Sequence, residues 1–372
     1  MPKRLVVCCD GTWDSPDERD RHSPTPTNVT KVALSVARED RNGREQRTFY
    51  RLGVGTRRPE RISGGGFGFG VSRAIRDTYR FLVENYEPGD QLYFFGFSRG
   101  AFTARSTVGF IRNCGILRRE NAGLIDRAFA LYRSRSSTNH PKSVESTLFR
   151  SAYSYEPRIR FIGVWDTVGA MGIPITGSAL IAVLNRRTRF HDTSLSSTVD
   201  AAFHALAIDE KRNSFCPTLW TTTSANQRVE QVWFTGVHRD VGGGYSQHGL
   251  SDIPLLWMMD RAQECGLAFV EASPRASLAR VAAGLPDEDK DLREAMLAKP
   301  DALADPHNSW KGWYRIPRPH RRELGKSDRA HEWAASTAVE RRKAGLEPAS
   351  PQLAAYLDGG GQVMDVSAAI ES

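Results

Sequence analysis

Several short stretches of this chain are apolar at nearly every position, and helical patterns separate them. A strand with apolar side chains on both faces has to be covered on both faces, and parallel strands need a crossover between them. The pattern therefore predicts an α/β fold with a mostly parallel sheet and helices on both faces. The stretches interpreted as strands, some with the turn that follows, are 4–9, 44–56, 91–97, 158–170 and 229–245.

Other segments depart from this alternation. Residues 116–150 and 172–200 are interpreted as helical insertions that could cover the site, and residues 57–70 as a glycine-rich loop. From about residue 272 the chain is rich in Ala, Arg, Pro and Asp, which is typical of peripheral helices and loops. We therefore expect an α/β domain over 1–271 and a helical and loop extension over 272–372 that packs on the same domain.

The segment Gly96-Phe97-Ser98-Arg99-Gly100 lies between an apolar run and a helical pattern, and it fits G-x-S-x-G. In a nucleophile elbow the serine occupies a sharp turn, and glycines flank it because side chains there would clash with the strand and the helix. The start of the helix also favours developing negative charge. We predict that Ser98 is a nucleophile and that Gly96 and Gly100 support the turn; the alternative is an ordinary packed turn serine.

A nucleophilic serine needs a base and an acid that orients the base. Sites in parallel sheets form beyond the carboxyl ends of strands, where Asp166 and His238 are expected. The chain order Ser98, Asp166, His238 is that of α/β-hydrolases. Asp240 is interpreted as bracing the following turn and Asp209 as a supporting acid. Weaker candidates for the base, none of which directly ends a strand-like run, are His204, His248 and His331.

An ester hydrolase of this kind also needs donors for the oxyanion. The backbone N–H of Arg99, directly after Ser98, is one expected donor. The second is expected from the loop after the first strand, at Gly11 or Thr12. Asp10 is interpreted as the residue that shapes this loop through hydrogen bonds.

The formal net charge of +8 permits attraction to phosphate groups or to an anionic membrane surface. The basic residues are partly concentrated in RRPER, ILRRE, RIPRPHRRE and VERRK, which we interpret as solvated surface. No nucleic-acid-binding motif accompanies them, so we expect no nucleic-acid partner.

The five cysteines show no CxxC spacing, and adjacent Cys8 and Cys9 should point to opposite faces of a strand. We expect reduced thiols in or near the core and no metal site. The first residues do not fit a signal peptide, because the apolar stretch LVVCC is too short, and no apolar run reaches 18 residues. These features favour a cytoplasmic protein.

Seven segments together resemble a family of α/β-hydrolases formerly labelled a domain of unknown function, whose best-understood members are phospholipase effectors of bacterial type VI secretion. The resemblance runs from about residue 5 to residue 257. It implies an α/β-hydrolase fold, a triad on Ser98, Asp166 and His238, acyl-ester hydrolysis, and a catalytic domain at 1–271. It adds an immunity or delivery protein as a candidate partner and delivery by a secretion system as an alternative location. The segments are CCDGTWD, TNVTKVA, YRLGVGT, GFSRGAFTAR, GVWDTVGA, HALAIDEKRNSF and VWFTGVHRDVGGGY.

We interpret the chain as a serine ester hydrolase that acts on a lipid or a small acyl ester, without a cofactor. The stretches 64–70 and 172–185 could cover the acyl chain; apolar residues of the second stretch could equally be ordinary core. One alternative is a non-catalytic member of the same fold that binds lipid or protein. Another is a phosphoryl-transfer enzyme that uses the DGT loop, although Cys8 replaces the first aspartate of D-x-D-G-T.

Overall fold

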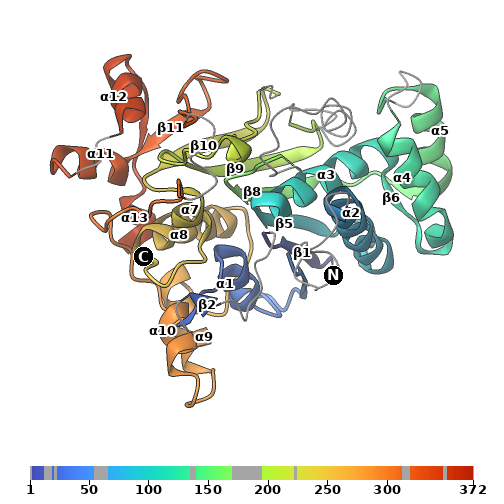
Figure 1. The fold of residues 1–372 in the computed structure, drawn as a ribbon. Helices are drawn as coiled ribbons and strands as arrows, with labels where there is room; N and C mark the ends of the chain where they lie inside the picture. Colours follow the sequence, from blue (N-terminus) through green and yellow to red (C-terminus); the bar gives the residue numbers. More distant parts are fainter. Residues whose placement is uncertain are drawn as a thin grey trace.

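An eight-stranded sheet forms the centre of the molecule (Figure 1). The computed structural model describes residues 2–11, 19–20, 23–53, 66–134, 140–169, 195–221, 224–311, 319–346 and 350–371. The strand order is β12-β11-β10-β9-β8-β5-β1-β4, and every neighbouring pair is parallel. The strands are β1 (Arg4–Cys9), β4 (Gln46–Arg51), β5 (Gln91–Phe97), β8 (Ile159–Trp165), β9 (Val199–Ala207), β10 (Arg228–Phe234), β11 (Glu332–Ala335) and β12 (Val363–Met364). The predicted α/β class is confirmed.

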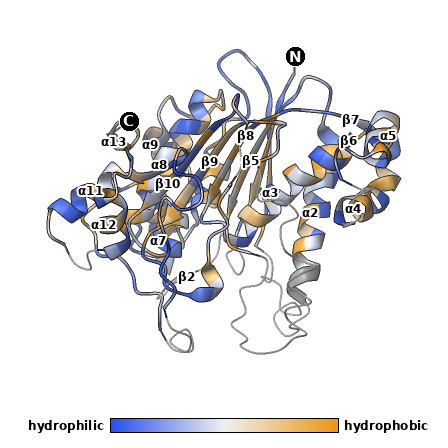
Figure 2. Ribbon diagram, turned by 90° about the horizontal axis from the view of Figure 1, so that it is seen from above, coloured by the Kyte–Doolittle hydropathy of each residue, from blue (hydrophilic) through white to orange (hydrophobic). Residues whose placement is uncertain are grey.

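Helices cover both faces of this sheet (Figure 2). On one side α2 and α3 pack on Leu5 and Val7 of β1, whereas α1 and α8 pack on the opposite face, where Val6 lies. Cys8 and Cys9 point into these two different cores, as predicted from the alternation of side chains along a strand. The helices are α1 (Asn28–Ser35), α2 (Gly66–Asn85), α3 (Ser98–Cys114), α4 (Ile125–Arg133), α5 (Val144–Tyr153), α7 (His238–Gly242), α8 (Gly249–Glu264), α9 (Pro274–Ala283), α10 (Lys290–Met296), α11 (Ser336–Lys343), α12 (Pro351–Asp358) and α13 (Ser367–Glu371).

The insertion at 116–150 is largely helical, as expected, and its helices α4 and α5 lie at the outer side of α2 and α3 (Figures 1 and 2). The second expected insertion, 172–200, falls mostly outside the described residues, and its last two residues begin β9. The glycine-rich loop ends earlier than predicted, because α2 already begins at Gly66.

The chain beyond residue 272 forms part of the main sheet, besides the peripheral helices and loops that we expected. It supplies β11 and β12 to the edge of the main sheet, in parallel register with β10. It also forms a third apolar cluster with the end of β9 and with β10, in which Trp233 and Tyr356 are buried. Of the five free cysteines, only Cys216 is exposed, so the prediction of a core thiol is wrong at that position.

A buried ion pair joins the helices on one face of the sheet. Lys31 of α1 lies 2.9 Å from a carboxylate oxygen of Asp252 in α8, and both side chains are almost inaccessible. The other oxygen of Asp252 is held by His248 at 2.6 Å and by the backbone N–H of Lys299 at 2.8 Å. A buried charge is tolerated when it is paired in this way, so the pair fixes α1 against α8.

We predict that Lys31→Met lowers the free energy of unfolding in urea by about 3 kcal/mol or more, because it leaves the buried Asp252 without its cation. The matched control is Lys326→Met, since Lys326 pairs with Glu323 on the surface and should contribute about 1 kcal/mol or less. Equal losses in the two variants would contradict the prediction.

Candidate active site

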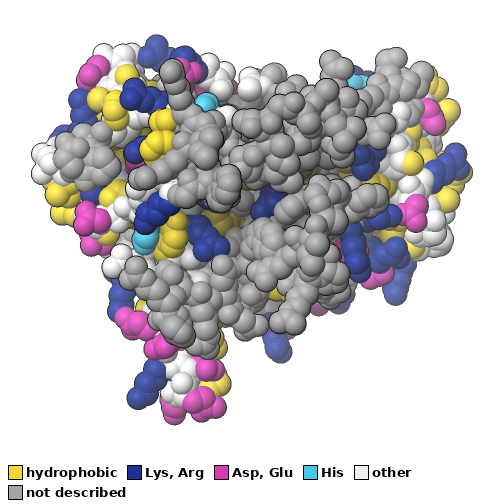
Figure 3. Space-filling view, in the orientation of Figure 1, with side chains coloured by type: hydrophobic (Ala, Val, Ile, Leu, Met, Phe, Trp, Pro, Cys, Tyr) yellow, Lys and Arg dark blue, Asp and Glu magenta, His cyan; other side chains and the backbone are white. Residues whose placement is uncertain are grey.

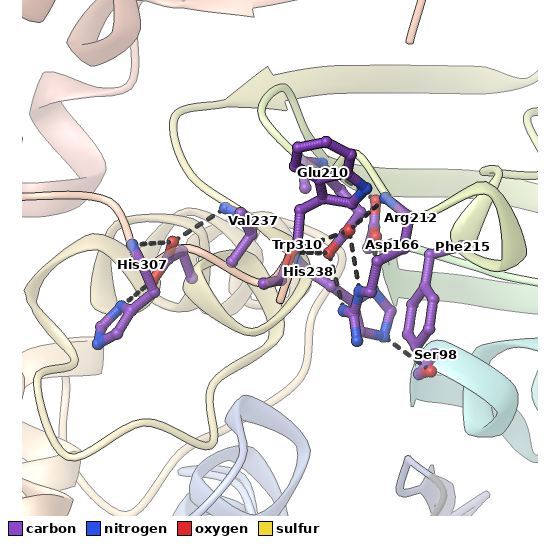
Figure 4. Close-up of polar contacts among 12 residues, drawn as sticks. Ser98, Asp166, Glu210, Arg212, Phe215, Val237, His238, His307 and Trp310 are labelled. Carbon is purple, nitrogen blue, oxygen red and sulfur yellow. Dashed lines mark hydrogen bonds and ion pairs between the residues drawn. The ribbon is translucent and has the colours of Figure 1, made fainter. Parts of the chain in front are cut away.

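Three polar side chains meet beyond the carboxyl ends of β5, β8 and β10 (Figure 4). Ser98 is the first residue of α3 and follows β5, Asp166 follows β8, and His238 begins α7 after β10. The Nε2 atom of His238 lies 2.8 Å from the Ser98 hydroxyl, and its Nδ1 atom lies 2.5 Å from Oδ2 of Asp166. The structure thus brings the predicted nucleophile, base and acid into one line of hydrogen bonds.

The turn at Ser98 is built on close backbone contacts. A Cβ atom on Gly100 would lie 2.1 Å from the carbonyl oxygen of Cys9, and one on Gly96 would lie 2.7 Å from the backbone of Ala101. Neither position can therefore hold a side chain without moving β1 or α3. Ser98 itself has φ of 56°, a left-handed conformation that is costly for a residue with a Cβ.

Asp166 is completely buried and also has a left-handed backbone, with φ of 40°. Its Oδ1 atom accepts hydrogen bonds from the N–H of Ala207 at 3.0 Å and from Nη1 of Arg322 at 2.6 Å. Its Oδ2 atom accepts from Nη2 of Arg322 at 2.9 Å, in addition to His238. Burial alone would raise the pKa of Asp166, but Arg322 and His238 outweigh it and lower the pKa below its usual range.

His238 lies between two aromatic rings. The ring centroid of Phe97 lies 4.6 Å from that of the imidazole. Phe215 approaches the imidazole edge-on, with centroids 4.8 Å apart (Figure 4). Burial lowers the pKa of His238 below its ordinary 6.5, although the hydrogen bond and charge of Asp166 act in the opposite direction. The neutral imidazole, which can accept a proton from Ser98, is therefore favoured.

The loop after β9 braces the base from its backbone side. Glu210 accepts a hydrogen bond from the backbone N–H of His238 at 3.3 Å and from the Ser309 hydroxyl at 2.9 Å. Arg212 binds the same carboxylate and also covers the Phe215 ring at 3.5 Å. Burial would raise the pKa of Glu210, but Arg212 lowers it to about 2, so the carboxylate is ionised.

Asp209 and Asp240, the two supporting acids expected from the sequence, bind the backbone next to His238. Asp209 accepts a hydrogen bond from the N–H of Gly236 at 2.7 Å, and burial raises its pKa to about 6. Asp240 accepts from the N–H of Val237 at 2.9 Å and from His307 at 2.6 Å. Both acids hold the turn before and within α7, whereas the ring of His238 binds Asp166 and Ser98.

The other histidines considered as bases have partners of their own. His204 in β9 is buried, and its Nε2 atom accepts the N–H of Thr167 at 3.1 Å. Burial and the charge of Arg105 lower the pKa of His204 to about 3, so it stays neutral. His248 binds Asp252, and His331 binds Asp328 at 2.8 Å.

The loop after β1 lies against the elbow, as the contact between Gly100 and Cys9 requires. The N–H of Gly11 donates to Oδ1 of Asp10 at 2.7 Å, and Thr12 lies outside the described residues. Asp10 is buried and accepts further hydrogen bonds from the hydroxyls of Thr27, Thr30 and Tyr50. Burial raises the pKa of Asp10, although the hydrogen bonds from these donors act in the opposite direction.

Several expectations fall outside the part of the chain that the structure describes. They include the apolar stretch 172–185 and the start of the glycine-rich segment. Among the residues that are described, no group of three or more His, Cys, Asp or Glu side chains is arranged to hold a metal ion. Within the same residues, no helix is long and apolar enough to span a membrane.

Sequence reasoning missed Arg322, Glu210 and Phe215. Arg322 belongs to RIPRPHRRE, which we interpreted as solvated surface. This interpretation is wrong for Arg322, which is 1% exposed. The same interpretation of VERRK is wrong for Arg341, which is 4% exposed. Glu210 and Phe215 follow β9, which was not recognised as a strand. Recognising VDAAFHALA as a buried strand would have placed both residues at its carboxyl end.

The chain was compared with known proteins. A Saccharomyces cerevisiae protein described as uncharacterized is 30% identical over 262 residues, which cover 62% of this chain and 36% of that protein. The chain thus spans about a third of that relative's length.

Two solved structures are also similar. The crystal structure of an uncharacterized protein from Pseudomonas aeruginosa has a TM-score of 0.47 and 19% identity, covering 81% of this chain and 49% of that one. The structure of the Tle1 effector bound to the VgrG spike of the type 6 secretion system has a TM-score of 0.46 and 15% identity, covering 80% and 78%.

The family comparison covers most of the chain. The model described as the catalytic domain of the type VI secretion phospholipase effector Tle1-like family matches residues 3–261. This range contains β1, β4, β5, β8, β9 and β10 of the main sheet, together with Ser98, Asp166 and His238. The chain therefore belongs to the Tle1-like family of type VI secretion phospholipase effector catalytic domains.

Proposed function

We propose that this chain is a serine hydrolase that cleaves an acyl ester, with a phospholipid as its substrate, through an acyl-enzyme on Ser98. The observation that carries the proposal is the unbroken line of hydrogen bonds from the Ser98 hydroxyl through His238 to Asp166. Membership of a phospholipase effector family supports the lipid substrate.

In the proposed mechanism, the Ser98 oxygen attacks the ester carbonyl while Nε2 of His238 takes the hydroxyl proton. The imidazolium then gives this proton to the departing alcohol oxygen, and the acyl group stays on Ser98. A water molecule, deprotonated by the same nitrogen, attacks the acyl carbonyl. The imidazolium then returns this proton to the Ser98 oxygen as the bond between that oxygen and the acyl carbon breaks, which releases the acid. Asp166 fixes the tautomer of His238 and stabilises its positive charge in both steps.

The oxyanion would form at the start of α3, where backbone N–H groups and the helix dipole favour negative charge. We propose the N–H of Arg99 as one donor, since this residue follows the nucleophile in the first turn of the helix. The loop after β1 lies beside the elbow and is the proposed source of the second donor. Because the N–H of Gly11 donates to Asp10, it would serve only after this contact opens.

We propose three candidate partners on the basis of family membership: an anionic membrane surface, an immunity protein and a delivery protein. On the face seen in Figure 3, Lys and Arg side chains of the described residues lie among Asp and Glu side chains and do not form a single basic patch. On this face, the described residues therefore offer no single patch for an anionic lipid surface. We propose delivery by a secretion system as an alternative to a cytoplasmic location.

The first test is covalent labelling. A fluorophosphonate should react with the wild-type protein through Ser98, with loss of fluoride, and Ser98→Ala should abolish both labelling and ester hydrolysis, a loss of several orders of magnitude in rate. Mass spectrometry of the labelled peptide identifies the site. Ser151→Ala is the control, because Ser151 is exposed on α5. Labelling of the Ser98→Ala protein would disprove the proposed nucleophile.

The second test is substrate preference. We expect the wild-type protein to release fatty acid from phosphatidylglycerol or phosphatidylethanolamine vesicles faster than it hydrolyses soluble short-chain esters. Both rates are corrected by the rate of the Ser98→Ala protein on the same substrate. The measurement is titration of released acid at matched ester concentration. A clear preference for the soluble esters would point to a general esterase.

The third test is the pH dependence. The base must be neutral, so the labelling rate should fall as the pH drops through the pKa of His238. Since burial places this pKa below 6.5, we expect the rate at pH 6.5 to remain above half of its plateau. The measurement is the rate of fluorophosphonate labelling between pH 4 and 9; a midpoint above 6.5 would contradict the structural interpretation.

A further inference from the structure

Arg322, a buried arginine from the C-terminal part of the chain, binds Asp166, the acid of the proposed triad. Arg322 is 1% exposed, and its two terminal nitrogens bind the two oxygens of Asp166 at 2.6 and 2.9 Å. This is a bidentate pair, the geometry in which a guanidinium and a carboxylate fix each other's orientation. Arg322 lies beyond residues 3–261, the range that the family model matches.

The same guanidinium also holds two backbone segments around the base. Its Nη1 atom donates to the carbonyl of Ala207 at the end of β9 at 2.7 Å, and Nη2 donates to the carbonyl of Phe215 at 2.6 Å. The four N–H bonds of the two terminal nitrogens are thereby all used. Because the Phe215 ring packs on His238, Arg322 orients both the acid and one wall of the imidazole pocket.

We propose that Arg322 is a positioning residue of the triad, which holds the Asp166 carboxylate and the Phe215 turn in place around His238. This inference rests on the proposed hydrolase function. It goes beyond it by assigning a role in the site to a residue outside the matched catalytic domain.

The proposal has an electrostatic consequence that a purely structural role would lack. Arg322 balances the charge of Asp166, so the imidazolium of His238 gains less from that carboxylate than it would from an unpaired one. Among the described residues, Glu210 and Arg212, from the loop after β9, also act on the charge of His238. Removing the Arg322 charge should therefore favour the protonated histidine. It should move the acid limb of the pH profile, the range in which the labelling rate falls as the pH drops, to higher pH.

The test is fluorophosphonate labelling of the full chain as a function of pH, together with kcat and KM for a soluble ester. We expect Arg322→Met to lower the labelling rate at pH 7 and kcat by about 10- to 100-fold, the loss known for partners that orient metal ligands, with little change in KM. The acid limb should move to higher pH. Arg322→Lys should keep the acid limb near its wild-type position, because the charge remains, and should lower kcat, because the bidentate contact is lost.

Arg341→Met is the matched control, since Arg341 is another buried arginine of the C-terminal part and donates to the carbonyl of Ala304. This control should lower the melting temperature without moving the acid limb. A limb that stays in place in Arg322→Met would overturn the proposal. If Arg322→Met does not fold, the result for Arg322→Lys decides the question. A labelling rate equal to that of wild type overturns the proposal. A lower labelling rate, with the acid limb in its wild-type position, supports it.

The outcome for wild type separates this inference from the function itself. If wild-type Ser98 takes no label, the hydrolase proposal fails, and the Arg322 proposal fails with it. If wild-type Ser98 is labelled but Arg322→Met is labelled at the same rate and pH, the hydrolase proposal stands and only the role of Arg322 is lost.

Discussion

The carboxylate of Asp166 is ionised in a place that water does not reach, and much of the architecture serves to make this tolerable. Removing a carboxylate from water costs several kcal/mol, roughly, unless charges and hydrogen bonds replace the lost hydration. The replacements come from three directions: β9 through the N–H of Ala207, α7 through His238, and the C-terminal part through Arg322. Segments far apart in the sequence are thus held together at one buried charge.

The predictable part of the fold and site is the part governed by local pattern. Apolar strands, their parallel arrangement, and polar residues at strand ends can be inferred because each leaves a periodic or positional signal, and these signals placed Ser98, Asp166 and His238. β9 was not recognised because a buried histidine interrupts its apolar run. The ring of this residue, His204, accepts the N–H of Thr167 and packs against Trp220. β11 and β12 are too short for any periodicity. Arg322 has no local signal, since an arginine in a basic cluster is normally solvated.

Backbone strain is confined to the same place. Among the described residues, Ser98 and Asp166 are the only non-glycine positions with positive φ. Such conformations cost of order 1–3 kcal/mol each and persist only where the surroundings over-determine them. At Ser98 the surroundings are the close contacts of Gly96 and Gly100; at Asp166 they are the donors on its carboxylate. The side chains that must meet are therefore held by backbone geometry as well as by hydrogen bonds.

The position of Arg322 in the chain bears on the order in which the site is completed. During synthesis the strands from β1 to β10 emerge before residue 322, so the sheet can begin to assemble while Asp166 still lacks its cation. On the proposed role of Arg322, a nascent chain at this stage holds all three triad residues without the group that orients the acid. The proposed hydrolase would then acquire full activity only late in translation, after most of residues 3–261 have left the ribosome.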